Sequence, residues 1–252
     1  MSFANASIPA IDQAAEAIAS AKCVVATTGA GISVESGIPD FRSAGGIWSR
    51  YPPEEYASIE AFLENPSKVW ALWRELGDQL GACRPNPGHR ALADIERHAK
   101  LRAVITQNVD NLHQDAGSQD VVEYHGNSRR LVCLDCGALT PFNPDKVARG
   151  VPHCPCGGLL KPDVVMFGEL IPPAAMLRAE SLARTADVVI VVGTSAQVFP
   201  AAQLPFTAKE RGAIVIEVNT EKTDLTRTIT DVFLQGPAGI VLPALAERIL
   251  RL

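Results

Sequence analysis

The feature of this sequence most able to do chemistry is a glycine pair that follows an apolar run. Gly29 and Gly31 come directly after residues 23–28, which predict a buried parallel strand. Such glycines let the backbone approach a pyrophosphate, and a following helix N-terminus would point N–H groups at that anion. The third glycine of the usual pattern is displaced to Gly37, and a Pro-Asp-Phe-Arg turn follows over 39–42. The loop is therefore predicted to bind a dinucleotide and to reach over its reacting end.

Four of the six cysteines form a second feature, in two close pairs separated by 17 residues. The ligands would be Cys133, Cys136, Cys154 and Cys156. Two such pairs are typical of a tetrahedral structural Zn²⁺ site. His153 and Cys156 also have ligand spacing, so His153 is an alternative to Cys154, which we favour because a thiolate suits a closed site. Reduced surface thiols or a redox pair are a weaker alternative, because redox C-x-x-C motifs occur singly.

Polar blocks recur along the chain after the glycine loop. They are Thr106–His113, His125–Gly126, Phe167–Glu169, Gly193–Ser195 and Val218–Asn219. Together with residues 29–42, their order resembles the sirtuins, the NAD-dependent protein lysine deacylases. The match runs from about residue 21 to about residue 245, nearly the whole chain. The chain departs from the family in its second cysteine pair, which sirtuins usually space by two or more residues.

The resemblance implies an NAD-dependent protein lysine deacetylase that forms deacetylated lysine, nicotinamide and 2′-O-acetyl-ADP-ribose. The zinc of such an enzyme is structural. Protein mono-ADP-ribosyl transfer is the alternative reaction, and the presence of Asn108, Asp110 and His125 favours deacylation. A zinc-ribbon module that binds nucleic acid, or a nicotinamide dehydrogenase, fits the sequence less well. The expected partners are proteins that carry acetyl-lysine.

His125 is the catalytic base that the resemblance implies, taking a proton from the ribose 3′-hydroxyl. Histidine suits this role because its ordinary pKa lies near working pH. By the same resemblance, Asp110 would accept the carboxamide NH₂ of nicotinamide, and Asn108 would bond the ribose. The other histidines in or near motifs are interpreted as structural or supporting residues: His89, His98 and His113.

The resemblance also implies the remaining cofactor contacts. Phe41 would cover the nicotinamide pocket, and Arg42 would pair with phosphate. Asn219 would bind the adenosine ribose, with Ala238 near the adenine. The full set expected to bind NAD is Gly29, Ala30, Gly31, Val34, Asp40, Phe41, Arg42, Gln107, Asn108, Val109, Asp110, His125, Gly193, Thr194, Ser195, Asn219, Thr220 and Ala238.

Residues 164–169 resemble the substrate-binding strand of the family. A substrate segment would pair with its backbone by β-augmentation. The residues expected to contact it are Val165, Phe167, Gly168 and Glu169. Sirtuins that prefer acidic acyl groups carry a tyrosine and an arginine three apart, where this chain has Trp73 and Leu76. We therefore expect deacetylation, with neutral apolar acyl groups tolerated.

The elements that must position these residues alternate between strand and helix. Strands are expected at 23–28, 101–106, 188–192 and 214–218, and helices at 10–21, 58–80, 88–99 and 240–252. This alternation predicts an α/β fold, a doubly wound parallel Rossmann-like sheet. The large part would comprise about 8–50, 86–128 and 162–252. The smaller part would be a helical insert at about 51–85 and a zinc-ribbon module at about 129–161, all within one catalytic domain.

Bulk properties narrow the function further. The 252 residues are 47% hydrophobic, which allows a sizeable core, and the net charge of −5 argues against a nucleic-acid surface. The start lacks the features of a signal peptide, and no apolar run is long enough to span a bilayer. We therefore expect a cytoplasmic monomer, with no nucleic-acid or membrane partner, whose cysteines are thiols or metal ligands.

Overall fold

The computed structural model describes residues 7–40 and 46–252. Within them, six strands form a parallel sheet in the order β3-β2-β1-β7-β8-β9. Their bounds are β1 (Val24–Thr28), β2 (Leu101–Thr106), β3 (Val121–Glu123), β7 (Val188–Val192), β8 (Ile214–Asn219) and β9 (Val232–Gln235). The strand order reverses between β1 and β7, which makes the sheet doubly wound. The predicted fold class is confirmed.

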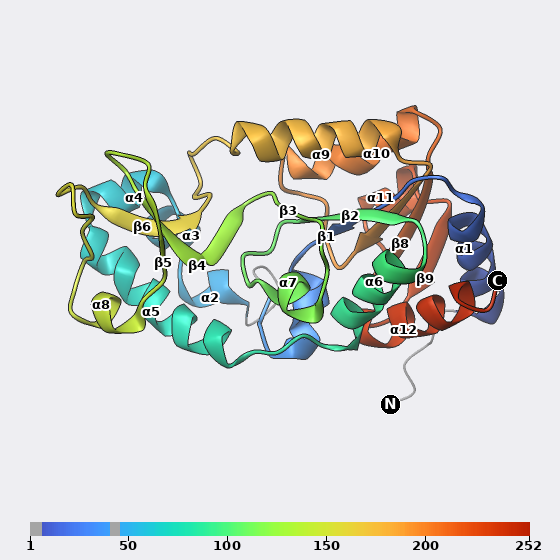
Figure 1. Ribbon diagram of the computed structural model, residues 1–252, viewed down its shortest axis with the longest axis horizontal. Helices are drawn as coiled ribbons and strands as arrows, with labels where there is room; N and C mark the ends of the chain where they lie inside the picture. The colour runs from blue at the N-terminus through green and yellow to red at the C-terminus, as the bar shows by residue number, and fades with distance from the viewer. Residues whose placement is uncertain (1–6, 41–45) are drawn as a thin grey trace.

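Helices cover both faces of this sheet (Figure 1). One face packs against α1 (Ile8–Ser20), α6 (Pro87–His98) and α12 (Ala238–Ile249), and the other against α9 (Pro173–Thr185), α10 (Leu204–Glu210) and α11 (Asp224–Thr228). Alternate residues of β7 serve the two cores: Ile190 faces the first, and Val189 and Val191 the second. Burial on both faces explains why these strands are continuous apolar runs. The short helices η1 (Ala30–Ser36), α7 (Leu112–Ala116) and η2 (Ala201–Gln203) follow β1, β2 and β7.

A smaller region lies at the other end of the molecule (Figure 1). In the described chain it holds a three-stranded antiparallel sheet in the order β5-β4-β6. Its elements are α2 (Ile47–Arg50), α3 (Pro53–Tyr56), α4 (Ile59–Glu64), α5 (Pro66–Ala82), β4 (Gly126–Cys133), β5 (Leu139–Pro141), α8 (Pro144–Ala148) and β6 (Leu160–Val164). A separate core joins α4, α5, β4, α8 and β6, and the Trp70 indole N–H donates to Leu160 O at 3.1 Å. The bounds proposed above for the two parts stay a prediction.

Three local expectations were wrong. The helix expected over 58–80 is two helices, because Pro66 cannot continue α4 and the Asn65 side chain caps α5 by accepting from Lys68 N. Of the substrate strand expected over 164–169, only Val164 lies in a strand, the last residue of β6, and the chain turns at Gly168, whose φ is +87°. The strand expected at 214–218 is the last that the sequence predicts, but β9 follows it in the chain and pairs with it as a further strand.

The helix expected after the glycine pair is the 3₁₀ helix η1. The Gly31 N–H donates to Gly193 O at 2.8 Å, and the Ile32 N–H donates to Gly29 O. These amides are therefore used inside the protein and do not point at a ligand.

Candidate functional site

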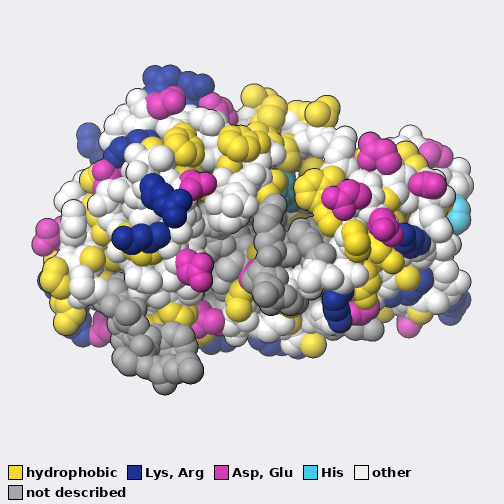
Figure 2. Space-filling model, turned by 180° about the vertical axis from the view of Figure 1, so that it is seen from behind, with side chains coloured by type: hydrophobic (Ala, Val, Ile, Leu, Met, Phe, Trp, Pro, Cys, Tyr) yellow, Lys and Arg dark blue, Asp and Glu magenta, His cyan; other side chains and the backbone are white. Residues whose placement is uncertain are grey.

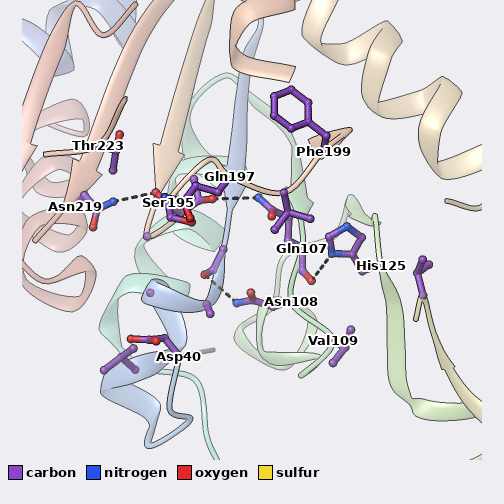
Figure 3. Close-up of a pocket in the computed structure, with 18 of the residues that line it drawn as sticks. Asp40, Gln107, Asn108, Val109, His125, Ser195, Gln197, Phe199, Asn219 and Thr223 are labelled. Atoms are coloured by element: carbon purple, nitrogen blue, oxygen red, sulfur yellow. Dashed lines mark hydrogen bonds between the residues drawn. The ribbon is translucent and has the colours of Figure 1, made fainter. Parts of the chain in front are cut away.

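A cavity of about 1110 Å³ opens at the carboxyl ends of the parallel strands. It begins where β1 and β7 end, at the reversal of strand order, which is the usual ligand crevice of this fold. It extends from Asn219 and Thr223 on one side to His125 and Phe199 on the other (Figure 3). The single cavity therefore reaches from the large sheet to the smaller region.

Two glycines bring β1 and β7 together at the cavity floor. A Cβ on Gly31 would lie 2.7 Å from Gly193 Cα, and a Cβ on Gly193 would lie 2.5 Å from Ile32 N. Gly193 also has a φ of +57°. Glycine is required here because the two backbones touch and leave no room for a Cβ.

Asn108 is fixed beside this floor by buried hydrogen bonds. Its Nδ2 donates to Gly29 O and to Ser33 Oγ, each at 3.1 Å. Ser33 Oγ donates in turn to the Asp110 carboxylate at 2.7 Å, which also accepts from Leu112 N. Burial raises the pKa of Asp110. Asp110 thus lies behind Asn108 in this structure, outside the described residues that line the cavity.

His125 lines the cavity at the junction of β3 with β4. Its Nδ1 is 3.1 Å from Gln107 O (Figure 3). Since a carbonyl oxygen can only accept, Nδ1 carries the proton and Nε2 is left with a lone pair. Burial lowers the pKa of His125, although the bond to Gln107 opposes this shift. The ring is therefore neutral near pH 7 and can accept a proton at Nε2.

Two further histidines lie buried beneath the site. His113 Nε2 is 2.9 Å from Thr28 Oγ1, and His89 Nε2 is 3.4 Å from Ser33 Oγ. Their ring centroids are 4.9 Å apart. Burial lowers the pKa of His89 to about 4 and that of His113 well below its ordinary value. Both histidines are neutral and support the buried side chains around Ser33. This agrees with their interpretation from the sequence as structural or supporting residues.

The two cysteine pairs meet in the smaller region. The sulfurs of Cys133, Cys136, Cys154 and Cys156 lie within 4.8 Å of one another. The closest Sγ–Sγ distances are 3.5 to 3.7 Å, near the roughly 3.8 Å expected for tetrahedral Zn²⁺ with Zn–S bonds of about 2.3 Å. The backbone N–H groups of Cys136 and Asp135 lower the pKa of the Cys133 thiol to about 7. The donor set fits a structural zinc ion, and His153 lies outside it, with its Nδ1 3.1 Å from Val151 O.

The segment 165–169 links the cavity to this smaller region. The Val165 N–H donates to His125 O, while Phe167 exchanges backbone bonds with Ala57 O and Ile59 N, all at 2.9 Å. The Glu169 carboxylate accepts from Met166 N at 2.8 Å. We call this segment the strap. It carries the predicted substrate residues, and its backbone runs along the cavity beside His125.

Comparison with known proteins places the chain in a family. A description of the Sir2 family matches residues 29–200. The chain belongs to the Sir2 family. It is 50% identical over 239 residues to NAD-dependent protein deacylase 2 of Pyrobaculum aerophilum, covering 94% of this chain and 95% of that protein.

Solved structures agree with this assignment. A Sir2 homologue in complex with NAD has a TM-score of 0.90 at 43% identity, covering 95% of this chain and 94% of that one. Sir2Af2 bound to a myristoylated histone peptide has a TM-score of 0.79 at 41% identity, covering 96% and 97%.

Most residues predicted for the site line the Sir2 cavity. They are Gly29, Ala30, Gly31, Val34, Asp40, Gln107, Asn108, Val109, His125, Val165, Phe167, Gly168, Glu169, Gly193, Thr194, Ser195, Asn219, Thr220 and Ala238. Asp110 does not, as described above. The predictions for Phe41 and Arg42 lie outside the described residues.

Sequence reasoning missed two walls of the cavity. One is the loop after β7, from which Gln197 and Phe199 reach the cavity (Figure 3). The other is the segment from Glu221 to Asp224, which follows β8. Their positions directly after strands that end at the crevice were the available signal.

Proposed function

We propose that this protein is an NAD-dependent protein lysine deacylase with acetyl-lysine as its preferred substrate. The observation that carries the proposal is His125, a neutral imidazole held by Gln107 O inside a cavity that also meets the strap. A base at this junction can reach both a cofactor bound over the strand ends and an acyl-lysine beside the strap. Family membership supports the same reaction.

When bound, NAD supplies an activated ribose carbon whose bond to nicotinamide can break. The strand ends at Gly29 and Gly193 would receive its phosphates, and Asn219 its adenosine ribose. Asn108 would hold the nicotinamide ribose through its carbonyl oxygen, because its Nδ2 protons already bond Gly29 O and Ser33 Oγ. His125 Nε2 would take the ribose hydroxyl proton. Asp110 would act through Ser33, by orienting the Asn108 amide.

The acyl group would lie near Trp73. Among the described residues of α5, this is the one that lines the cavity. The Arg74 guanidinium donates to Val147 O at 3.2 Å and so turns toward α8. The lining cations Lys222 and Arg227 follow β8, on the cofactor side. This placement favours neutral acyl groups, and the myristoylated peptide bound by Sir2Af2 supports tolerance of long apolar ones.

The partners would be proteins with an acylated lysine in an extended segment, which could pair with the strap. No helix within the described residues is long and apolar enough to cross a membrane. The monomeric state, the cytoplasmic location and the absence of a nucleic-acid partner stay predictions from the sequence.

The decisive test is nicotinamide release from NAD with an acetyl-lysine peptide, with the products identified by mass. We expect peptide-dependent release and acetyl-ADP-ribose, lowered about 10²- to 10⁴-fold in His125→Ala. His98→Ala, an exposed histidine on α6, is the matched control and should turn over like wild type. NAD consumption without peptide, with ADP-ribose attached to protein, would replace deacylation by ADP-ribosyl transfer.

A further inference from the structure

A carboxylate with no role in the reaction is fully buried beside the cofactor side of the cavity. Glu217 lies in β8, two residues before Asn219, and its exposed fraction is 0%. Within the described residues, no ion pair reaches it. A buried carboxylate is costly without a cation unless hydrogen-bond donors replace the lost water.

Three threonine hydroxyls supply those donors. Thr223 Oγ1 donates to one carboxylate oxygen at 2.5 Å, and Thr226 and Thr230 Oγ1 donate to the other at 2.6 and 2.8 Å. We call Glu217 and these hydroxyls the threonine cage. It draws together residues from 6 to 13 positions further along the chain.

The cage also fixes the start of α11. Thr223 Oγ1 accepts from Leu225 N, while Thr226 Oγ1 accepts from Thr223 N, so the two residues form a capping box. Each hydroxyl therefore accepts from the backbone and donates its proton to Glu217. An acceptor-only carboxylate suits this arrangement because it never competes for those backbone N–H groups.

The segment that the cage holds is a wall of the cavity. Its lining residues are Thr220, Glu221, Lys222, Thr223, Asp224 and Arg227. Thr223 belongs to both the wall and the cage, and it lies next to Asn219 at one end of the cavity (Figure 3). Asn219 is itself held from the other direction, since its Nδ2 donates to Thr194 O at 3.0 Å.

We propose that Glu217 is a positioning residue for the cofactor, which acts by holding the wall between β8 and α11 in its binding conformation. The proposal rests on NAD binding as given under Proposed function, with the adenosine half on the Asn219 side. Glu217 itself does not line the cavity. If the cage is weakened, the wall is no longer held in place, and the cofactor must order the wall when it binds. The affinity for the cofactor then falls. The strap and His125 are unaffected.

Two variants test the cage without touching the lining residues. Thr230→Val keeps the shape of the side chain and removes one donor, and Glu217→Gln keeps its size and removes the charge. Thr228→Val, an exposed residue of α11 whose hydroxyl bonds Asp224 O, is the matched control. The readouts are the Kd of ADP-ribose by calorimetry, the KM of NAD, the KM of the acetyl-lysine peptide, and Tm.

We expect Thr230→Val to weaken ADP-ribose binding roughly five- to twentyfold and to raise the KM of NAD, with kcat at saturating NAD and the peptide KM unchanged. Thr228→Val should match wild type in all of these. A lower Tm in Thr230→Val and Glu217→Gln, with the Kd of ADP-ribose as in wild type, would overturn the inference by making the cage merely structural. Failure of wild type to bind ADP-ribose would instead overturn the proposed function, and this inference with it.

Discussion

The two regions of this molecule are stabilised in different ways. The parallel sheet buries apolar side chains on both faces, against helices such as α12 and α9. The smaller region has one modest core, whose members include two of the four clustered cysteines, Cys133 and Cys154. In the described chain its sheet has three strands, and it relies on packing against the helices that share this core. The comparison teaches that the cofactor side is stabilised by burial on two faces, whereas the side next to the strap combines one smaller core with four cysteines that would add the binding energy of a metal ion.

The largest effect should come from breaking the zinc centre. Cys136→Ser removes a thiolate from a site type whose metal affinity contributes about 10 to 16 kcal/mol to folding. We expect loss of bound zinc, loss of hydrogen-exchange protection over 126–164, and deacylase activity at least about a hundredfold lower, because the strap loses its support. The six-stranded sheet should keep its protection.

The matched control is Cys83→Ser, since Cys83 is a half-buried thiol outside the cluster. It should keep zinc and activity. Full zinc content and activity in Cys136→Ser would show that the smaller region does not depend on the metal, and the contrast between the regions would disappear.

The same contrast explains what the sequence could predict. Strands β1, β2, β7 and β8 were predicted because a strand that is buried on both faces has a nearly continuous run of apolar residues in the sequence. In β4 the residues Asn127, Ser128 and Arg129 interrupt any such run, and that strand was missed. The cysteines were found because ligand chemistry fixes their types and spacing, independently of any periodicity.

Within the site, the sequence predicted which residues take part, but not which of them line the cavity and which lie buried behind those. Asn108 and Asp110 sit two apart after β2, and only the fold shows that Ser33 comes between them from another element. The contacts of Glu217 were equally unpredictable. Its threonine partners lie in and after a loop, and the path of a loop leaves no periodic pattern in the sequence. Contacts between side chains from distant segments require the three-dimensional path of the chain.

The second prediction concerns the strap, where the two regions meet. The Lys161 side chain is 5% exposed, and its Nζ lies 2.6 Å from Val164 O and 3.0 Å from the Glu169 carboxylate. Lys161→Met leaves a carboxylate and a carbonyl without their cation, which costs about 3 to 5 kcal/mol in a fully buried pair and less here, because the Glu169 side chain is 22% exposed. We expect the peptide KM to rise about tenfold or more, with the Kd of ADP-ribose unchanged.

Lys161→Arg, which restores a cation, should recover much of the peptide affinity. The measurement pairs steady-state kinetics with calorimetry on the same preparations. If Lys161→Met lost peptide affinity and ADP-ribose affinity equally, the strap and the cofactor side of the sheet would be coupled. That result would contradict the expectation that the substitution affects peptide binding alone.

A third prediction probes the apolar core of the large region. Leu242 of α12 is fully buried against the sheet, so Leu242→Ala should lower the free energy of unfolding by about 2 to 5 kcal/mol. Zinc content should not change. Ile240 on the same helix is 44% exposed, and Ile240→Ala should cost only about 0.5 kcal/mol. Urea unfolding measures both, and release of zinc at the Leu242→Ala transition midpoint would indicate that the two regions unfold together.

The smallest effect is the response of the large region to mild acid. His89 is fully buried, and burial lowers its pKa from 6.5 to about 4. Between these values the unfolded chain binds a proton that the folded chain does not, so stability falls as pH drops from about 6.5 toward 4, by at most about 1.4 kcal/mol per pH unit for this group. His113 acts in the same direction.

His89→Gln should flatten this dependence when urea unfolding is followed from about pH 7.5 down to about pH 5.5, because the unfolded variant has one proton fewer to gain. His98→Gln, at the exposed end of the same helix, should leave the slope as in wild type. An unchanged slope in His89→Gln would place the acid sensitivity elsewhere. The thiolates of the smaller region are the next groups to examine, since protons compete with zinc for them. A stability loss that tracks zinc release would move the acid-sensitive step from burial in the sheet to the metal centre.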